Sequence, residues 1–174
     1  MDPPDISTLA LMAFLKNMRL DSKKVLEGRW VEWALGIRVK IARMNNPRYI
    51  EILTELKRPE FSRLRRGQRI TMDILEPLIM KAMSEAIILD WENVDDETVE
   101  PRTEQEMILE GTDKKDWRYD SVQKLWFKKL PYTPERGFAI LQDPEYRDFY
   151  DFVNVESNET ESYRLDEIEE ARGN

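Results

Sequence analysis

ITMDILEPLIMKAMSEAIILDW, residues 70–91, is the most apolar stretch of this chain, and it decides how the fold is predicted. At 100° per residue, a helix over this stretch has a main apolar stripe and a second apolar stripe on another face. The main stripe consists of Ile74, Leu75, Leu78, Ala82, Ala86 and Leu89, and the second of Met80, Met83 and Ile87. Such a helix is either central to a core or covered by a partner.

Two further elements are predicted before this helix. Apolar residues at helical spacing predict a helix over residues 6–18. Over residues 28–44, apolar residues alternate with other residues, as in a strand, and Val31, Trp33 and Leu35 fall on one face. Gly36 interrupts this pattern, so a hairpin of two strands and one kinked strand are both compatible with it.

Three proline-containing sequences predict helix starts, because each places an oxygen-bearing cap before a proline at the first helical position. They are NNP at 45–47, TPE at 133–135 and DPE at 143–145. The first helix should end at Pro59. In the last helix, the residues at helical spacing form a core-facing aromatic stripe, which consists of Tyr146, Phe149, Tyr150 and Val153.

The rest of the acidic half is less regular. Residues 103–106 fit a capping box of Thr103 and Glu106, and Gly111 can end that short helix. Residues 154–174 are polar and acidic with almost no apolar period, so they predict a flexible tail. Residues 1–153 are then expected to form one compact helical domain, mainly α with a small N-terminal β-hairpin (α+β).

The composition excludes many kinds of chemistry. The 174 residues include no His and no Cys, so catalytic triads, thiol nucleophiles and Cys/His zinc sites are excluded, together with disulfides. No apolar run has the roughly 20 residues that a membrane span needs. We expect a non-enzymatic protein that needs no cofactor and binds no membrane.

Charge is divided unevenly along the chain. Residues 1–82 carry 16 basic residues (Lys and Arg) and 10 acidic residues (Asp and Glu). Residues 83–174 carry 11 basic and 25 acidic residues. The net charge of −8 therefore separates into +6 and −14. Such a bipolar chain favours protein partners or self-association over nucleic acid as its main ligand.

The order of short motifs resembles the tail assembly chaperones of long-tailed (siphovirus-type) bacteriophages. In that family, "G-x-W", "N-x-x-Y" and "K-x-P" precede a helix that ends in "D-W-x-x-V", and helix starts of the kinds "P-Y-T-x-E" and "D-P-E-Y" follow. The matching positions are Gly28, Trp30, Asn46, Tyr49, Lys57, Pro59, Asp90, Trp91, Val94, Pro131, Tyr132, Thr133, Glu135, Asp143, Pro144, Glu145 and Tyr146. The resemblance covers most of residues 28–153, and residues 97–128 are longer than the family pattern, which predicts an insertion.

The resemblance implies a protein of the infected bacterium's cytoplasm that is absent from the mature virion. It would bind the tape-measure protein, keep it soluble and promote assembly of the tail-tube protein around it. A structural protein of the phage tail or neck is an alternative, and a small nucleic-acid-binding regulator is a second.

Three sets of residues are candidates for binding partners, and each has a structural alternative. Met80, Met83 and Ile87 could grip amphipathic helices, or could simply be enclosed by their own domain. Ile140 and Phe152 fall outside the main stripes, so they are either partner contacts or isolated exposed apolar residues. The run Arg63, Arg65, Arg66 and Arg69 could bind nucleic acid or an acidic protein segment, or be a solvated surface.

The acidic stretch around Trp91 invites a metal-binding interpretation. Its carboxylates do not have the alternate spacing and central glycine of an EF-hand loop, so a solvated acidic turn is the better interpretation. Trp91 itself is predicted to be a core anchor whose indole N–H is bonded to backbone.

Overall fold

The structure, a computed structural model, describes residues 20–67 and 69–164. About 52% of the described residues are helical and 19% are in strands, so the fold is mixed α+β with two small antiparallel sheets. The helix predicted over residues 6–18 lies outside the described residues. In the part of the chain that the structure describes, no helix is long and apolar enough to cross a membrane.

The centre of the molecule is a three-stranded antiparallel sheet with the order β1-β2-β3. It consists of β1 (Arg29–Glu32), β2 (Arg38–Ile41) and β3 (Ile88–Glu92). β1 and β2 are the hairpin expected within residues 28–44, and β2 pairs with β3 through Val39 opposite Trp91. The helix α2 (Ser22–Glu27) precedes β1, and Gly28 between them has φ +69°.

The strand β3 corrects the prediction for residues 70–91. The helix α4 (Met72–Ala86) ends five residues before Trp91, and Ile88–Glu92 is a strand. A short apolar run cannot be assigned to helix or strand by its period alone, and here Ile88 and Trp91 are buried while Asp90 and Glu92 are exposed. Pairing with β2 explains why the chain leaves the helical path at Ile87.

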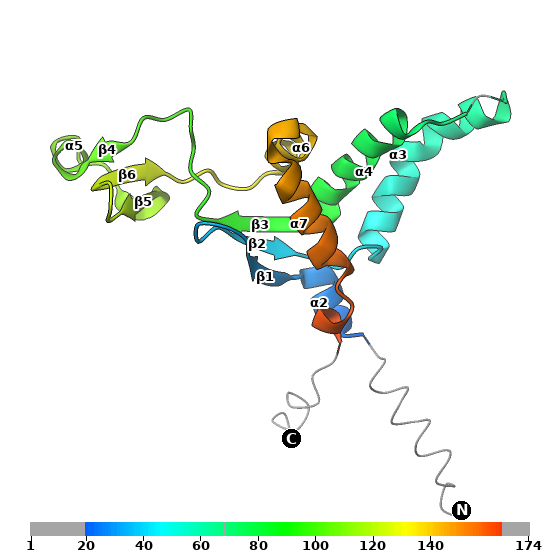
Figure 1. The fold of residues 1–174 in the computed structure, drawn as a ribbon, viewed down its shortest axis with the longest axis horizontal. Helices are drawn as coiled ribbons and strands as arrows, with labels where there is room; N and C mark the ends of the chain where they lie inside the picture. Colours follow the sequence, from blue (N-terminus) through cyan, green and yellow to red (C-terminus); the bar gives the residue numbers. More distant parts are fainter. Residues whose placement is uncertain (1–19, 68, 165–174) are drawn as a thin grey trace, which may run out of the picture.

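The prediction that Pro59 ends its helix is also wrong. The helix α3 (Pro47–Arg65) continues for six residues beyond Pro59, which lies inside it. An internal proline removes one backbone hydrogen bond and costs a helix about 3 kcal/mol. The packing of α3 along α4 offsets this loss. The two helices form a hairpin that projects from the sheet (Figure 1).

The core lies where α4, the central sheet and the C-terminal helices meet. The helix α6 (Pro134–Gln142) packs on α4, and the 3₁₀ turn η2 (Pro144–Tyr146) leads into α7 (Arg147–Asn158). Thr133 caps α6 by accepting a hydrogen bond from the Arg136 N–H, as predicted. Phe149 and Val153 of the predicted aromatic stripe are buried, and Tyr146 and Tyr150 are partly buried against them.

The predicted flexible tail begins too early. The helix α7 continues to Asn158, and the 3₁₀ turn η3 (Glu161–Tyr163) follows. Tyr163 is 0% exposed, and its hydroxyl donates a hydrogen bond of 3.1 Å to the Ile41 carbonyl. Residues 154–164 are therefore part of the fold, and residues 165–174 lie outside the described residues.

Residues 97–128, the predicted insertion, contain a second antiparallel sheet with the order β4-β6-β5. Its elements are β4 (Arg102–Thr103), α5 (Glu104–Leu109), η1 (Lys114–Asp116), β5 (Trp117–Asp120) and β6 (Leu125–Lys128). The capping box of Thr103 and Glu106 is confirmed. This unit lies to one side of the central sheet (Figure 1). The two segments that connect this unit to the rest of the chain run side by side, as an insertion requires. Between them, the Asp96 N–H donates a hydrogen bond of 2.7 Å to the Lys128 carbonyl.

Candidate functional site

Met80, Met83 and Ile87 are in the core, not on a partner-binding surface. Their exposed fractions are 7%, 0% and 0%, and all three belong to the cluster that joins α4 to the sheet and to α7. The alternative, that this helix is enclosed by its own domain, is the correct one for these residues. Their role is therefore stability, and a partner site has to be sought elsewhere.

Ile140 and Phe152 are both half-buried against the core. The Phe152 ring lies 6.1 Å from the ring of Trp33 and 6.4 Å from that of Phe149, measured between centroids. Ile140 lines a groove beside these rings. Ile140 therefore lines the candidate groove, and Phe152 lies next to it.

The four predicted arginines surround the free end of the α3–α4 hairpin. All four side chains are exposed, and Arg63 is paired with Glu60 one turn earlier at 3.2 Å. Two large apolar side chains at the same end are also exposed, Phe61 at 43% and Met72 at 64%. This surface, which we call the hairpin tip, lies far from the central sheet in Figure 1.

The best candidate for a binding site is an apolar groove of about 470 Å³ between the β1–β2 hairpin and the C-terminal helices. The central sheet forms one wall, and α6, η2 and α7 form the other, with residues 93–98 at its end. Its apolar lining consists of Trp33, Leu35, Ile37, Val39, Trp91, Val94, Leu130, Ile140, Tyr146 and Phe149. Apolar concave surfaces of this kind are typical of sites that bind apolar side chains of a partner.

Leu35 is the most unusual residue of the apolar groove. It is 99% exposed, and its φ of +55° is in the left-handed region that leucine rarely adopts. Gly36 follows with φ +77°, and the Ile37 N–H donates to the Ala34 carbonyl over 2.9 Å, so Leu35 and Gly36 are the central residues of a type I′ turn. The prediction placed Leu35 in a strand, on one face with Val31 and Trp33, and this turn corrects it. An exposed leucine where asparagine fits best makes this side chain a candidate binding residue.

Negative charge surrounds one end of the apolar groove. Asp96 and Glu97 line this end of the groove. Hydrogen bonds from the Thr98 hydroxyl and backbone N–H lower the pKa of the Asp96 carboxyl below its usual value. The pKa of the Tyr146 hydroxyl is raised, first by the negative charge of Glu97, then by burial, and then by the charges of Asp143 and Glu145. Asp95 is neutralised by Arg118, whose Nε lies 3.1 Å from its carboxylate. The groove is therefore apolar inside and acidic at its rim.

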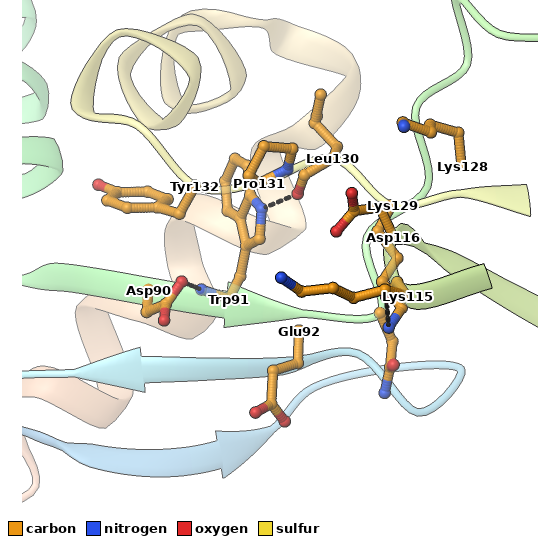
Figure 2. A pocket seen from close by; sticks show the side chains of 11 residues that line it. Asp90, Trp91, Glu92, Lys115, Asp116, Lys128, Lys129, Leu130, Pro131 and Tyr132 are labelled. Atoms are coloured by element: carbon orange, nitrogen blue, oxygen red, sulfur yellow. Dashed lines mark hydrogen bonds between the residues drawn. The ribbon is translucent and has the colours of Figure 1, made fainter. Parts of the chain in front are cut away.

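A second cavity, of about 620 Å³, lies on the other side of Trp91 (Figure 2). Lys115 and Asp116 of η1, Lys128 at the end of β6 and the following Lys129 line one side of it. Asp90, Trp91 and Glu92 line it from β3. The Trp91 indole N–H donates to the Leu130 carbonyl over 2.6 Å, as predicted, which fixes the connection between the two sheets. Figure 2 shows this bond, with the Lys115 side chain extending toward Trp91.

Tyr132 packs against Trp91 at the end of this cavity. The two rings are 4.8 Å apart in an edge-to-face arrangement, and the Tyr132 hydroxyl donates to the Ser84 carbonyl. Burial raises the pKa of this hydroxyl well above its usual value, so it stays protonated and acts as a structural donor. A Cβ at Gly137 would approach the Tyr132 hydroxyl to 2.8 Å, which explains a glycine at that helical position.

The acidic residues near Trp91 occupy separate places. Glu92 pairs with Arg38 at 3.0 Å, and Asp95 pairs with Arg118. Within residues 20–67 and 69–164, no group of three or more His, Cys, Asp or Glu side chains is arranged to hold a metal ion. The geometry of this region therefore serves ion pairing between elements of the fold.

No family model, curated protein or solved structure matches this chain. The site is consequently interpreted from its own geometry. Of the residues that line the groove, the sequence singled out Ile140 as a candidate partner contact, predicted Tyr146 and Phe149 as core residues, and did not single out Leu35 as a site residue. The signal that could have found it is a leucine directly before a glycine at the centre of a predicted hairpin, where asparagine is the usual residue.

Proposed function

We propose that this protein is a tail assembly chaperone of a long-tailed bacteriophage and that its apolar groove binds amphipathic helices of the tape-measure protein. The observation that carries the proposal is the apolar groove, together with the motif order that resembles this family. In the cytoplasm of the infected bacterium, the chaperone keeps its client soluble. It then promotes assembly of the tail-tube protein around the client and leaves before the virion is complete.

The chemistry of the client fits the groove. A long helical protein that has not yet found its partners exposes apolar stripes and aggregates through them. Side chains at i, i+3 and i+4 of such a stripe can enter an apolar groove, and Leu35 adds an exposed apolar contact at its edge. The acidic rim favours client segments in which lysine or arginine flanks the apolar residues.

The proposal is tested by co-expressing the chain with the tape-measure protein encoded by the same phage. We expect a soluble complex that co-purifies, whereas the tape-measure protein alone should be found in the pellet. Mass spectrometry of purified virions should detect the tape-measure protein but not this chain. A chain present in virions in stoichiometric amount, without a soluble complex, would identify a structural protein of the tail or neck.

The hairpin tip favours a second candidate, a regulator that binds nucleic acid through Arg63, Arg65, Arg66 and Arg69. Binding through phosphate contacts is expected to weaken steeply as salt concentration rises. Titration of duplex and single-stranded DNA and RNA at two salt concentrations therefore separates this candidate from the chaperone. The chaperone proposal predicts no specific complex with any of them.

The exchange Leu35→Asn is expected to stabilise the free protein while it weakens client binding. A non-glycine residue in the left-handed region costs roughly 1 kcal/mol or more, and asparagine reduces that cost in a type I′ turn. We expect the free energy of unfolding in urea to rise by about 0.5–1 kcal/mol, on the basis of these principles. The exchange Leu109→Asn, at another exposed leucine, is the control and should not raise it. A fall in stability for Leu35→Asn would show that the leucine is a packing residue.

A further inference from the structure

We propose that copies of this chain associate head to tail, with the hairpin tip of one copy bound to the apolar groove of the next. This inference does not depend on the proposed function, because it concerns the protein alone. It assigns a partner to two surfaces that the fold leaves open, and the partner is a second copy of the same chain.

The hairpin tip is both basic and apolar. In the described ranges, Arg65, Arg66 and Arg69 have no acidic group within 4 Å, so their charges are available to a partner. Phe61 and Met72 expose 43% and 64% of their surface beside them. A protein surface that carries large apolar residues within a field of arginines is typical of a binding site, because both residue types are enriched in interfaces.

The apolar groove is complementary to the tip in both respects. It offers an apolar interior to Phe61 and Met72, and its rim carries negative charge. Among the described residues, Glu97 and Glu145 form no ion pair with lysine or arginine within 4 Å. Asp96 forms none either, although Arg136 and Lys128 attract its carboxylate from farther away, and Asp95 is already paired with Arg118. Opposite charges around an apolar contact increase the association rate and fix the orientation of the two partners.

The positions of the two surfaces determine the kind of assembly. The hairpin tip and the tip of the β1–β2 hairpin, which borders the groove, lie at opposite sides of the molecule (Figure 1). One copy therefore cannot close both surfaces by itself. An interface between two different surfaces is heterologous, so it produces a ring or an open chain of copies. A client that enters the groove would compete with the neighbouring copy.

Two variants of the full chain test the inference without any client. The tip variant carries Arg65→Glu and Arg66→Glu, and the groove variant carries Leu35→Asn and Glu97→Gln, which removes a charge without creating a new partner for the mutant tip. Analytical ultracentrifugation should show that the wild-type mass rises with protein concentration and falls at high salt. Each variant alone should remain a monomer at every concentration. Arg48→Glu, at the opposite end of α3, is the control and should associate as the wild type does.

An equimolar mixture of the two variants provides the decisive result. The tip variant keeps an intact groove, and the groove variant keeps an intact tip, so one wild-type interface can form between them. We expect a dimer with twice the monomer mass and no larger species, which also shows that both variants are folded. A wild type that stays monomeric, a variant that still associates alone, or a mixture that stays monomeric would each overturn the inference.

Discussion

Replacing Tyr163 by alanine is expected to lower the free energy of unfolding by about 3–5 kcal/mol, the range found when a large buried aromatic side chain is removed. Tyr163 is 0% exposed, and its hydroxyl reaches the Ile41 carbonyl across the end of β2. Arg29 lies over its ring at 5.5 Å, and the Asp21 N–H donates to its carbonyl. Removal of this ring would separate the end of the described chain from α2 and the central sheet.

Urea unfolding followed by tryptophan fluorescence measures this loss. The exchange Tyr163→Phe is the control, because it keeps the ring and removes only the hydroxyl, which lies within hydrogen-bond distance of the Ile41 and Glu156 carbonyls. This loss should cost about 0.5–1.5 kcal/mol. The exchange Val155→Ala, at a side chain that is 63% exposed on the preceding helix, should have little effect. An equally small effect of Tyr163→Ala would mean that residues 159–164 do not contribute to the fold.

The exchange Asn46→Ala is expected to lower the free energy of unfolding by about 2–4 kcal/mol, because it removes a helix cap and also leaves buried carbonyl groups without a donor. Asn46 is 2% exposed. Its Oδ1 accepts a hydrogen bond from the Tyr49 N–H, and its Nδ2 donates to the carbonyls of Arg43 and Ala86 over 2.9 and 3.0 Å. One side chain thus starts α3 and fixes it to the end of α4.

Two comparisons separate these roles in the same unfolding measurement. The exchange Thr133→Ala removes only a cap, at the exposed start of α6, and should cost about 1 kcal/mol. The exchange Asn46→Ser restores a capping oxygen but not the amide that reaches Ala86, so its cost should lie between those of Thr133→Ala and Asn46→Ala. If Asn46→Ala cost no more than Thr133→Ala, the bonds to Arg43 and Ala86 would have no role in stability.

The helix starts could be predicted from the sequence because they are local. Asn46, Thr103 and Thr133 each accept a hydrogen bond from the backbone N–H three residues later, and that chemistry needs no distant partner. Trp91 was predicted as an anchor for a similar reason, since a buried indole N–H needs an acceptor. Its acceptor, the carbonyl of Leu130, lies 39 residues away and could not be predicted.

Most errors in prediction depend on distant packing, whereas the turn at Leu35 and Gly36 is local. Ile88–Glu92 is a strand because β2 offers it a partner, and the chain continues as helix beyond Pro59 because α4 lies alongside. Tyr163 was assigned to a tail because nothing near it in sequence predicts its burial against β2. The apolar groove was missed because its residues come from the central sheet, residues 93–98 and the C-terminal helices, which only the folded chain brings together.

The central claim is that the apolar groove binds the client, and the most direct measurement compares Leu35→Asn with Leu109→Asn and the wild type in co-expression with the tape-measure protein. We predict that the wild type and Leu109→Asn retain a soluble complex. Leu35→Asn should lose most of the co-purified client although its own free energy of unfolding is at least that of the wild type. A Leu35→Asn variant that holds the tape-measure protein in solution as well as the wild type does would contradict the account.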